Sequence, residues 1–131
     1  MKTDKRTDKR KLGDIGENIA YDFLKSRGFE IIEKNYLRKW GEIDIVAKKA
    51  GVIRFIEVKS VKSSNVTHAT SDNYRPEDNM HPWKLKRLGR AIQTYLLEKN
   101  IDSDWQLDLI TVKINEATRR ARVELIENII I

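Results

Sequence analysis

Two acidic residues lie in neighbouring segments rich in Ile, Val and Phe, at a spacing that could support metal-assisted chemistry. The segments read Gly-Glu-Ile-Asp-Ile-Val-Ala (41–47) and Ile-Arg-Phe-Ile-Glu-Val-Lys (53–59), with a turn around residues 50–51 between them. Short β-branched and aromatic runs joined by a tight turn predict a β-hairpin. A loop of two or four residues would place Asp44 opposite Glu57, whereas a three-residue loop would break this register.

The predicted pairing brings two like charges together. Directly opposed residues of a hairpin have Cβ atoms about 4.5–5.5 Å apart, and like charges at that distance destabilise the strands. A hard divalent cation with oxygen ligands, Mg²⁺ or Mn²⁺, would compensate. Asp44 and Glu57 are therefore the predicted metal ligands.

Lys59 and Glu17 complete the predicted catalytic set. Strand alternation places Lys59 on the same face as Glu57, two residues before it. The metal would activate a water and neutralise charge on a phosphate, and the ammonium would orient that water or stabilise the transition state. Glu17 lies at the edge of an apolar helical stripe, from which it could join the site as a further ligand or acceptor.

A simpler interpretation needs no metal. In it, Glu42 pairs with Lys59, Asp44 is a solvated strand residue, and the charges keep an exposed hairpin face wet. Charged proteins often contain this spacing by chance, so periodicity alone favours the simpler interpretation.

The rest of the chain supplies the elements that would position these residues. Apolar residues at helical spacing predict a helix over residues 12–27, with Gly28 as its stop, and a second helix begins at Pro82. A long mobile loop is expected over residues 61–80. Strands are predicted at 29–36, 42–48, 52–60, 105–114 and 119–126. The order is α-β-β-β-α-β-β, a mixed β-sheet flanked by helices in one α/β domain over residues 12–131.

Composition bounds the class of protein. The chain has 131 residues, 40% of them hydrophobic and 35% charged, which indicates a globular protein rather than a disordered or membrane protein. The absence of cysteine excludes disulfides and thiolate sites and favours a cytoplasmic setting. No signal peptide or membrane-spanning segment is expected. Residues 1–11 carry much of the net charge of +6, and their repeated Thr-Asp-Lys-Arg is more typical of a flexible solvated arm than of a phosphate-binding one.

Several basic, aromatic and histidine side chains are candidates for contacts with nucleic acid. A basic helix face and the long loop could bind phosphates, and a solvated surface is the equal alternative. The three tryptophans could stack on bases, although packing is the commoner role. His68 and His81 are weaker candidates. The predicted phosphate contacts are Lys62, Arg75, Lys84, Lys86, Arg87 and Arg90, and the tryptophans are Trp40, Trp83 and Trp105.

The sequence resembles the YraN-like family from the first predicted helix to the last predicted strand. The resemblance rests on residues 13–20, 41–47 and 55–59, together with Asn35. That family is similar in fold to archaeal Holliday junction resolvases and the wider PD-(D/E)xK nucleases. The resemblance implies a restriction-endonuclease-like core and catalytic roles for the same four residues, Glu17, Asp44, Glu57 and Lys59.

The sequence departs from the family pattern at three places. Ile43 stands before Asp44 where the superfamily has proline, a change that leaves the carboxylate geometry intact. Ser60 and Val61 replace a threonine and a basic residue, which removes a phosphate contact. A basic residue is also missing two places before Asp108, to which a structural role is assigned.

The favoured hypothesis is an Mg²⁺- or Mn²⁺-dependent endonuclease acting on DNA, with branched or junction structures as candidate substrates. A resolvase should be a homodimer, because a branched duplex has near two-fold symmetry. Fold similarity does not establish activity, so the alternative is a non-catalytic nucleic-acid-binding or scaffold protein. A protein-interaction module is the third possibility.

Overall fold

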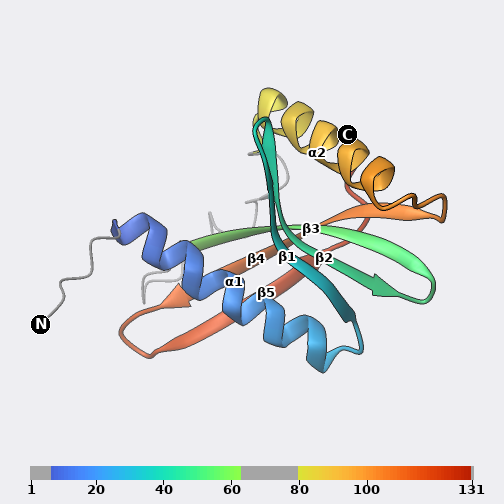
Figure 1. The fold of residues 1–131 in the computed structure, drawn as a ribbon. Helices are drawn as coiled ribbons and strands as arrows, with labels where there is room; N and C mark the ends of the chain where they lie inside the picture. Colours follow the sequence, from blue (N-terminus) through green and yellow to red (C-terminus); the bar gives the residue numbers. More distant parts are fainter. Residues whose placement is uncertain (1–6, 63–79, 131) are drawn as a thin grey trace, which may run out of the picture.

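The computed structural model describes residues 7–62 and 80–130, and Figure 1 shows their arrangement. Five strands form one mixed sheet in the order β1-β2-β3-β4-β5, in which only β3 and β4 are parallel. The predicted order α-β-β-β-α-β-β is confirmed. The elements are α1 (Asp8–Ser26), β1 (Glu30–Arg38), β2 (Gly41–Lys49), β3 (Val52–Lys62), α2 (Pro82–Glu98), β4 (Trp105–Asn115) and β5 (Arg120–Ile126).

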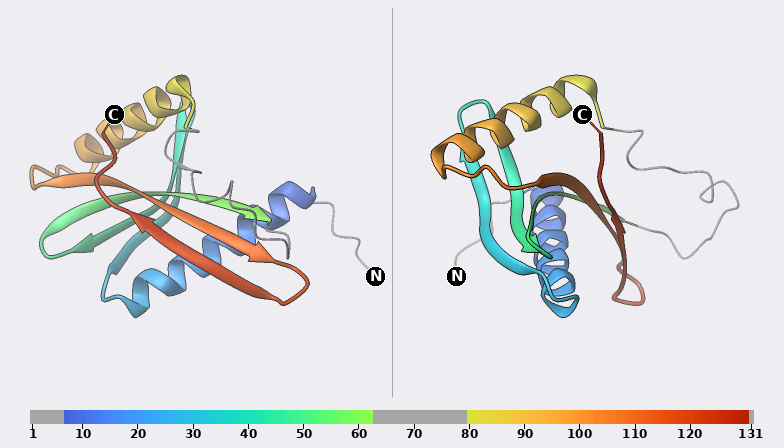
Figure 2. Two further views of the ribbon diagram at one scale, coloured as in Figure 1. Left: turned by 180° about the vertical axis from the view of Figure 1, so that it is seen from behind. Right: turned by 90° about the vertical axis from the view of Figure 1, so that its right-hand side faces the viewer.

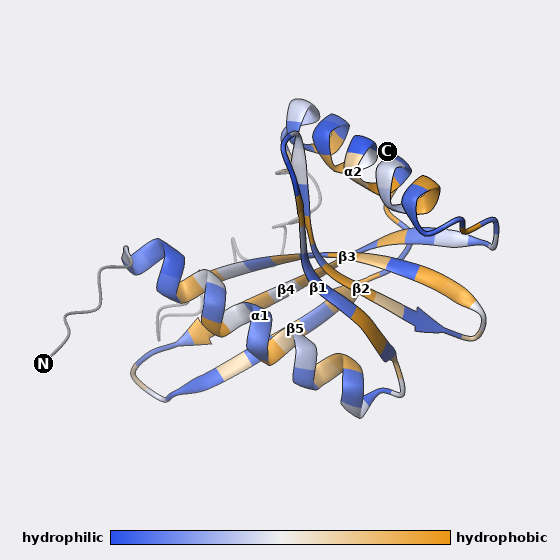
Figure 3. Cartoon of the chain, viewed as in Figure 1, coloured by the Kyte–Doolittle hydropathy of each residue, from blue (hydrophilic) through white to orange (hydrophobic). Residues whose placement is uncertain are grey.

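The two helices pack on opposite faces of the sheet, which gives the protein two hydrophobic cores (Figures 1 and 2). The α1-side core joins Ala20 and Leu24 to strand residues such as Ile56. The α2-side core joins Ile92 and other helix residues to strand residues such as Phe55. Figure 3 shows the matching amphipathic pattern, since each helix carries both hydrophobic and hydrophilic residues. Neither helix is long and apolar enough to cross a membrane, within the residues described.

Helix α1 begins four residues before the predicted start, at Asp8 rather than residue 12. Thr7 is its N-cap, and its hydroxyl accepts a hydrogen bond of 3.1 Å from the amide of Arg10. Such a cap satisfies one of the free amides of the first turn, and Asp8 favours the positive end of the helix dipole. Lys9, Arg10 and Lys11 therefore lie in a helix and not in the predicted arm; residues 1–6 lie outside the described residues.

The β2–β3 hairpin has the predicted register. Lys49 pairs with Val52, so the loop has two residues, and the ladder continues to Ile45 paired with Ile56. The loop residues at positions 50 and 51 have φ of +53° and +78°, as a type I′ turn requires. Beyond that last pair the two strands separate.

The β1–β2 ribbon turns over where it leaves β3. Lys34 pairs with Ile45, which lies in the α1-side core, whereas Tyr36 pairs with Ile43 and both lie in the α2-side core. Residues two apart on a regular strand share a face, so the ribbon rolls between these pairs. Asn35, which lies inside this interval, has a φ of +54°. The roll turns the end of the ribbon toward α2 (Figure 1).

The predicted long loop over residues 61–80 begins later than expected. Strand β3 continues to Lys62, so residues 61 and 62 belong to the sheet, and residues 63–79 lie outside the described residues.

At the other end of the chain, Ile129 donates its amide to Leu107 O at 2.7 Å and packs against the α2-side core. Ile129 therefore completes the core.

Candidate active site

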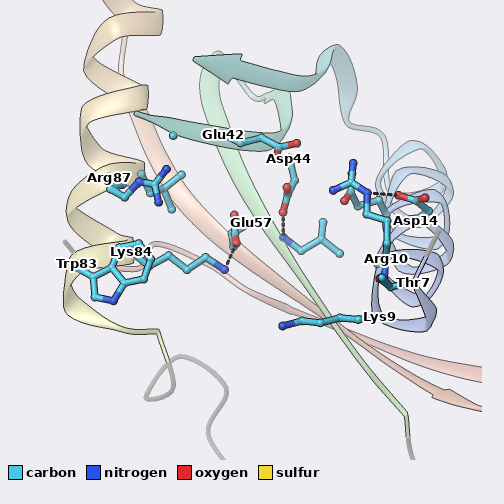
Figure 4. A pocket seen from close by; sticks show the side chains of 15 residues that line it. Thr7, Lys9, Arg10, Asp14, Glu42, Asp44, Glu57, Trp83, Lys84 and Arg87 are labelled. Atoms are coloured by element: carbon cyan, nitrogen blue, oxygen red, sulfur yellow. Dashed lines mark hydrogen bonds and ion pairs between the residues drawn. The ribbon is translucent and has the colours of Figure 1, made fainter. Parts of the chain in front are cut away.

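A cavity of about 640 Å³ opens where β2 separates from β3, and both helices contribute to its walls. Figure 4 shows acidic side chains of the sheet between basic side chains of the two helices. The acidic lining residues are Asp14, Glu17, Glu42, Asp44 and Glu57; the basic ones are Lys9, Arg10, Lys84 and Arg87; the others are Thr7, Gly13, Gly41, Val58, Trp83 and Leu88.

Asp44 bridges the gap between the separating strands. It is not a ladder partner of Glu57, because strand pairing ends one residue earlier; instead, its Oδ2 accepts a 2.8 Å hydrogen bond from the amide of Val58. Burial, and next the charge of Glu57, raise the pKa of Asp44 to about 9, and the bond from Val58 only partly opposes them. A carboxyl in this setting holds its proton at neutral pH unless a cation compensates it.

Glu57 points into the same cavity from β3 and is only 7% exposed. Lys84 Nζ, from the first turn of α2, lies 2.7 Å from Glu57 Oε1 (Figure 4). Partial burial lowers the pKa of Lys84, but the charge of Glu57 and its hydrogen bond outweigh that effect and the net shift is upward. Lys84 is therefore held as an ammonium against the carboxylate.

Two further carboxylates meet at Asn35. The orientation that satisfies the Asn35 amide places its nitrogen 2.8 Å from Glu17 Oε1 and 3.1 Å from Glu42 Oε1. Burial, followed by the charges of Glu42 and Asp14, raises the pKa of Glu17, against an opposing effect of Arg10. The amide thus joins α1 to β2 and separates two like charges.

Gly16 sets the distance between α1 and the sheet. A Cβ atom at this position would lie 1.6 Å from Ser60 Oγ, so only glycine lets the helix approach β3 this closely. Glu17 is the next residue, and the same close approach brings its carboxylate to the cavity.

The structure brings together three of the four predicted catalytic residues, namely Glu17, Asp44 and Glu57. Lys59 does not line the cavity; it is half-buried on β3 beside Thr111 of β4, although strand alternation gives it the face of Glu57. The predicted pairing of Lys59 with Glu42 is absent from the β2–β3 ladder, which ends before either residue.

The predicted phosphate-binding residues separate into two groups. Lys84 and Arg87 line the cavity, whereas Lys86 does not. The Arg90 guanidinium lies over the Trp40 ring, 4.8 Å from its centroid. Lys62 Nζ pairs with Glu116 Oε1 at 3.2 Å, away from the cavity lining. Arg75 and His68 lie outside the described residues.

Sequence reasoning missed the functional placement of Lys9, Arg10 and Asn35. A helix start judged from apolar periodicity overlooks a basic first turn, although Thr7 followed by Asp8 is an N-cap signal that could have revealed it. Asn35 gives a weaker signal, since asparagine merely tolerates positive φ.

Asp108 has the structural role expected of it. It is fully buried, and its Oδ1 accepts hydrogen bonds from Gln106 Nε2 and the Asn128 amide, while Arg54 lies 3.3 Å from Oδ2. His81 is the N-cap of α2 rather than a residue of the carboxylate cluster.

The donor set of the cavity fits a hard divalent cation in part. Within residues 7–62 and 80–130, no three Asp, Glu or His side chains lie close enough together to enclose a metal ion. Asp44 and Glu57 nevertheless offer carboxylate oxygens at one cavity. Mg²⁺ is commonly held by one or two carboxylates, with water and substrate phosphate completing its octahedron, and two ligands suffice for such a site.

Comparisons with known proteins give similarity along most of the chain. Residues 16–112 match the uncharacterised protein family UPF0102. A UPF0102 protein of Campylobacter hominis is 38% identical over 119 residues, 91% of this chain and 93% of the relative. One of Helicobacter pylori is 40% identical over 120 residues, 92% of this chain and 91% of the relative. One of Campylobacter jejuni subsp. doylei is 41% identical over 101 residues, 77% and 82% of the two chains.

Proposed function

Because the chain belongs to the uncharacterised protein family UPF0102, whose name states no activity, we propose its function from its own residues: a divalent-metal-dependent nuclease that hydrolyses DNA phosphodiesters. The YraN-like resemblance is confirmed as membership of this family, while similarity to Holliday junction resolvases stays part of the proposal. The observation that carries the proposal is a pair of carboxylates, the half-buried Asp44 and the buried Glu57, in a cavity with basic residues on two sides.

The chemistry is attack of water on phosphorus. A phosphorus–oxygen bond to water forms, the bond to one sugar oxygen breaks, and the proton that the water loses is balanced by a proton taken up by the departing sugar oxygen. A bound Mg²⁺ or Mn²⁺ would lower the pKa of water and neutralise charge on the phosphate. Asp44 and Glu57 would hold the cation, and Glu17, joined to Glu42 through Asn35, would support them with a further acceptor. The basic side chains then stabilise the charge that grows on the phosphate oxygens.

Two lysines are candidates for that stabilising role. Lys59 is proposed from its place two residues after Glu57, and Lys84 from its contact of 2.7 Å with the Glu57 carboxylate. With a cation at the carboxylates, the ammonium of Lys84 would be free to turn to the phosphate. Activity of Lys59→Ala and Lys84→Ala, measured separately, assigns the role.

The basic residues on both sides of the acids support a polyanionic substrate. Lys9 and Arg10 reach the cavity from α1, and Lys84 and Arg87 reach it from α2. A phosphate backbone lying between the helices would place one phosphate at the carboxylates. We propose DNA in the cytoplasm as the setting, with a homodimer where the substrate is a four-way junction.

A non-catalytic nucleic-acid-binding protein is the second candidate. The observations that favour it are the ion pair of Lys84 with Glu57 and the position of Lys59 off the cavity lining. In that protein the basic residues would bind nucleic acid and the ion pair would stabilise the fold, without catalysis.

Cleavage of labelled DNA tests the proposal. Wild type, Asp44→Asn and Lys59→Ala are incubated with single-stranded, duplex, flap and four-way-junction DNA in Mg²⁺, Mn²⁺ or EDTA, with Asp22→Asn as an exposed control on α1. We expect metal-dependent products from wild type and the control, and none from Asp44→Asn. Salt-sensitive binding without cutting of any substrate would overturn the nuclease proposal in favour of the binding protein.

A further inference from the structure

Three tryptophans have three different environments in the structure. Trp105 is partly buried and packs against the α2-side core, with its ring 5.7 Å from the Phe55 ring in an edge-on arrangement. Trp40 is half-buried in the turn between β1 and β2. Trp83 is 53% exposed and lines the cavity of the carboxylates (Figure 4). Only Trp83 therefore combines an accessible ring with a place at the candidate active site.

The Trp83 ring is held in place by its neighbours in the first turns of α2. The amide of Trp83 donates to Nδ1 of the capping His81 at 3.4 Å, and the two rings lie 5.6 Å apart at 58°. The Arg87 guanidinium lies 5.4 Å from the centre of the Trp83 ring. Arg87 is fixed in turn, because its Nε donates to Trp40 O at 2.8 Å. The ring thus has an aromatic neighbour and a guanidinium beside it, and Trp83 remains 53% exposed.

The charges around Trp83 indicate what would lie on it. Lys84 and Arg87 flank it on α2, and Lys9 and Arg10 face it from α1 across the cavity. Cations that follow a phosphate backbone, combined with an aromatic ring on which a base can stack, are the features that bind single-stranded nucleic acid. In a duplex the base faces are covered by their neighbours, so a ring reaches a base face only where the strand is unpaired or displaced.

We infer that Trp83 stacks on an unpaired base of a strand whose phosphates lie along the basic residues of the cavity, so that the site takes a single-stranded segment of DNA. This inference rests on the proposed function for the cutting of that segment, but not for its binding. It narrows the substrate to strands with unpaired nucleotides at the cleavage point, such as single strands, flaps and open junctions.

Binding in EDTA, where cutting does not occur, tests the stacking by itself. Fluorescence anisotropy is measured with a labelled oligothymidine, a duplex of equal length, and an abasic phosphodiester strand of equal length. The variants are Trp83→Ala and Trp83→Phe, with Leu97→Ala as the control, since Leu97 is 81% exposed near the other end of the same helix. Far-ultraviolet circular dichroism checks that each variant is folded.

The expected result is specific to the strand with bases. Trp83→Ala weakens oligothymidine binding about ten-fold or more, Trp83→Phe retains most of the affinity, and Leu97→Ala binds as wild type does. Neither duplex nor abasic binding changes in Trp83→Ala. Equal loss on all three ligands, no loss on oligothymidine, or no binding by wild type would overturn the inference. Stacking without cleavage would support the inference on Trp83 and overturn the nuclease proposal. Cleavage that is unchanged in Trp83→Ala would support the nuclease proposal and overturn the inference on Trp83.

Discussion

Lys84 Nζ lies 2.7 Å from Glu57 Oε1, so a cation from α2 occupies one side of a buried carboxylate on β3. The two residues are far apart in the sequence and meet only because the crossover helix packs back on the sheet, beside β2 (Figure 1). An ammonium at this place partly compensates the acidic cluster in the way that a divalent cation would.

Removal of that ammonium should make the protein more dependent on metal. In EDTA we expect the free energy of unfolding of Lys84→Met to be about 1 kcal/mol lower than that of wild type, because Glu57 loses its partner. The effect is small because Lys84 is half exposed to solvent. Mn²⁺ should raise the melting temperature of Lys84→Met more than that of wild type. Lys86→Met is the matched control on the exposed side of the same helix. Equal responses of both variants to EDTA and Mn²⁺ would contradict the prediction.

The raised pKa of Asp44 predicts how stability depends on pH. The carboxyl titrates near 3.8 in an ordinary setting and near 9 in the folded protein, so between these values the folded state keeps a proton that the unfolded state has lost. Stability should therefore fall as pH rises through this window. In EDTA we expect the stability of Asp44→Asn to fall less with rising pH than that of wild type. At pH 9 the free energy of unfolding of Asp44→Asn should be about 1 to 3 kcal/mol higher than that of wild type.

Thermal unfolding at several pH values measures this effect, with Asp22→Asn as an exposed control on α1. Parallel pH profiles for wild type and Asp44→Asn would show that Asp44 does not keep its proton in the folded protein.

Gly16 and Gly13 form a matched pair on α1. Alanine favours a helix over glycine by about 1 kcal/mol, and a Cβ at Gly13 would meet nothing within 4 Å, so Gly13→Ala should stabilise the protein by up to that amount. Gly16→Ala should destabilise it by about 1 to 3 kcal/mol, because the new Cβ overlaps Ser60 Oγ. Chemical denaturation gives both values, and adding Ser60→Gly to Gly16→Ala should recover most of the loss. Stabilisation by Gly16→Ala alone would refute the close approach.

Asn35 should matter for its amide as well as for its backbone. Asn35→Gly keeps the left-handed backbone and removes the amide, whereas Asn35→Asp places a third negative charge beside Glu17 and Glu42. At pH 7 we expect Asn35→Asp to be less stable than Asn35→Gly by about 1 kcal/mol, and the difference should vanish below about pH 4 as the carboxyls take up protons. Thermal unfolding at the two pH values measures this, and equal stability at pH 7 would argue against the amide bridge.

Local sequence patterns predicted the order of the elements and the register of the hairpin. Alternation in residues 41–47 and 53–59 and the turn at 50–51 are short-range features, and their consequence is confirmed by the pairing of Ile45 with Ile56. The same pattern wrongly extended that ladder to Asp44 and Glu57, because the roll of the β1–β2 ribbon depends on packing against α2 and on one left-handed residue.

The residues of the candidate site were predictable only where they follow from the periodicity of a strand or a helix. Asp44 and Glu57 were found from their own segments, and the helical stripe placed Glu17. The contact of Lys84 with Glu57 depends on the position that α2 takes on the sheet after a long connection, and no local pattern predicts that position. Lys9 and its neighbour Arg10 were missed because capping, rather than apolar periodicity, decides where α1 begins.

Whether Asp44 and Glu57 together hold a divalent cation can be read from the number of Mn²⁺ ions bound per chain. Isothermal titration calorimetry of wild type, Asp44→Asn and the double variant Asp44→Asn/Glu57→Gln gives this number without the need for a substrate. We expect one Mn²⁺ per wild-type chain, weaker binding in Asp44→Asn and none in the double variant. Unchanged binding in the double variant, or no binding by wild type, would contradict this expectation.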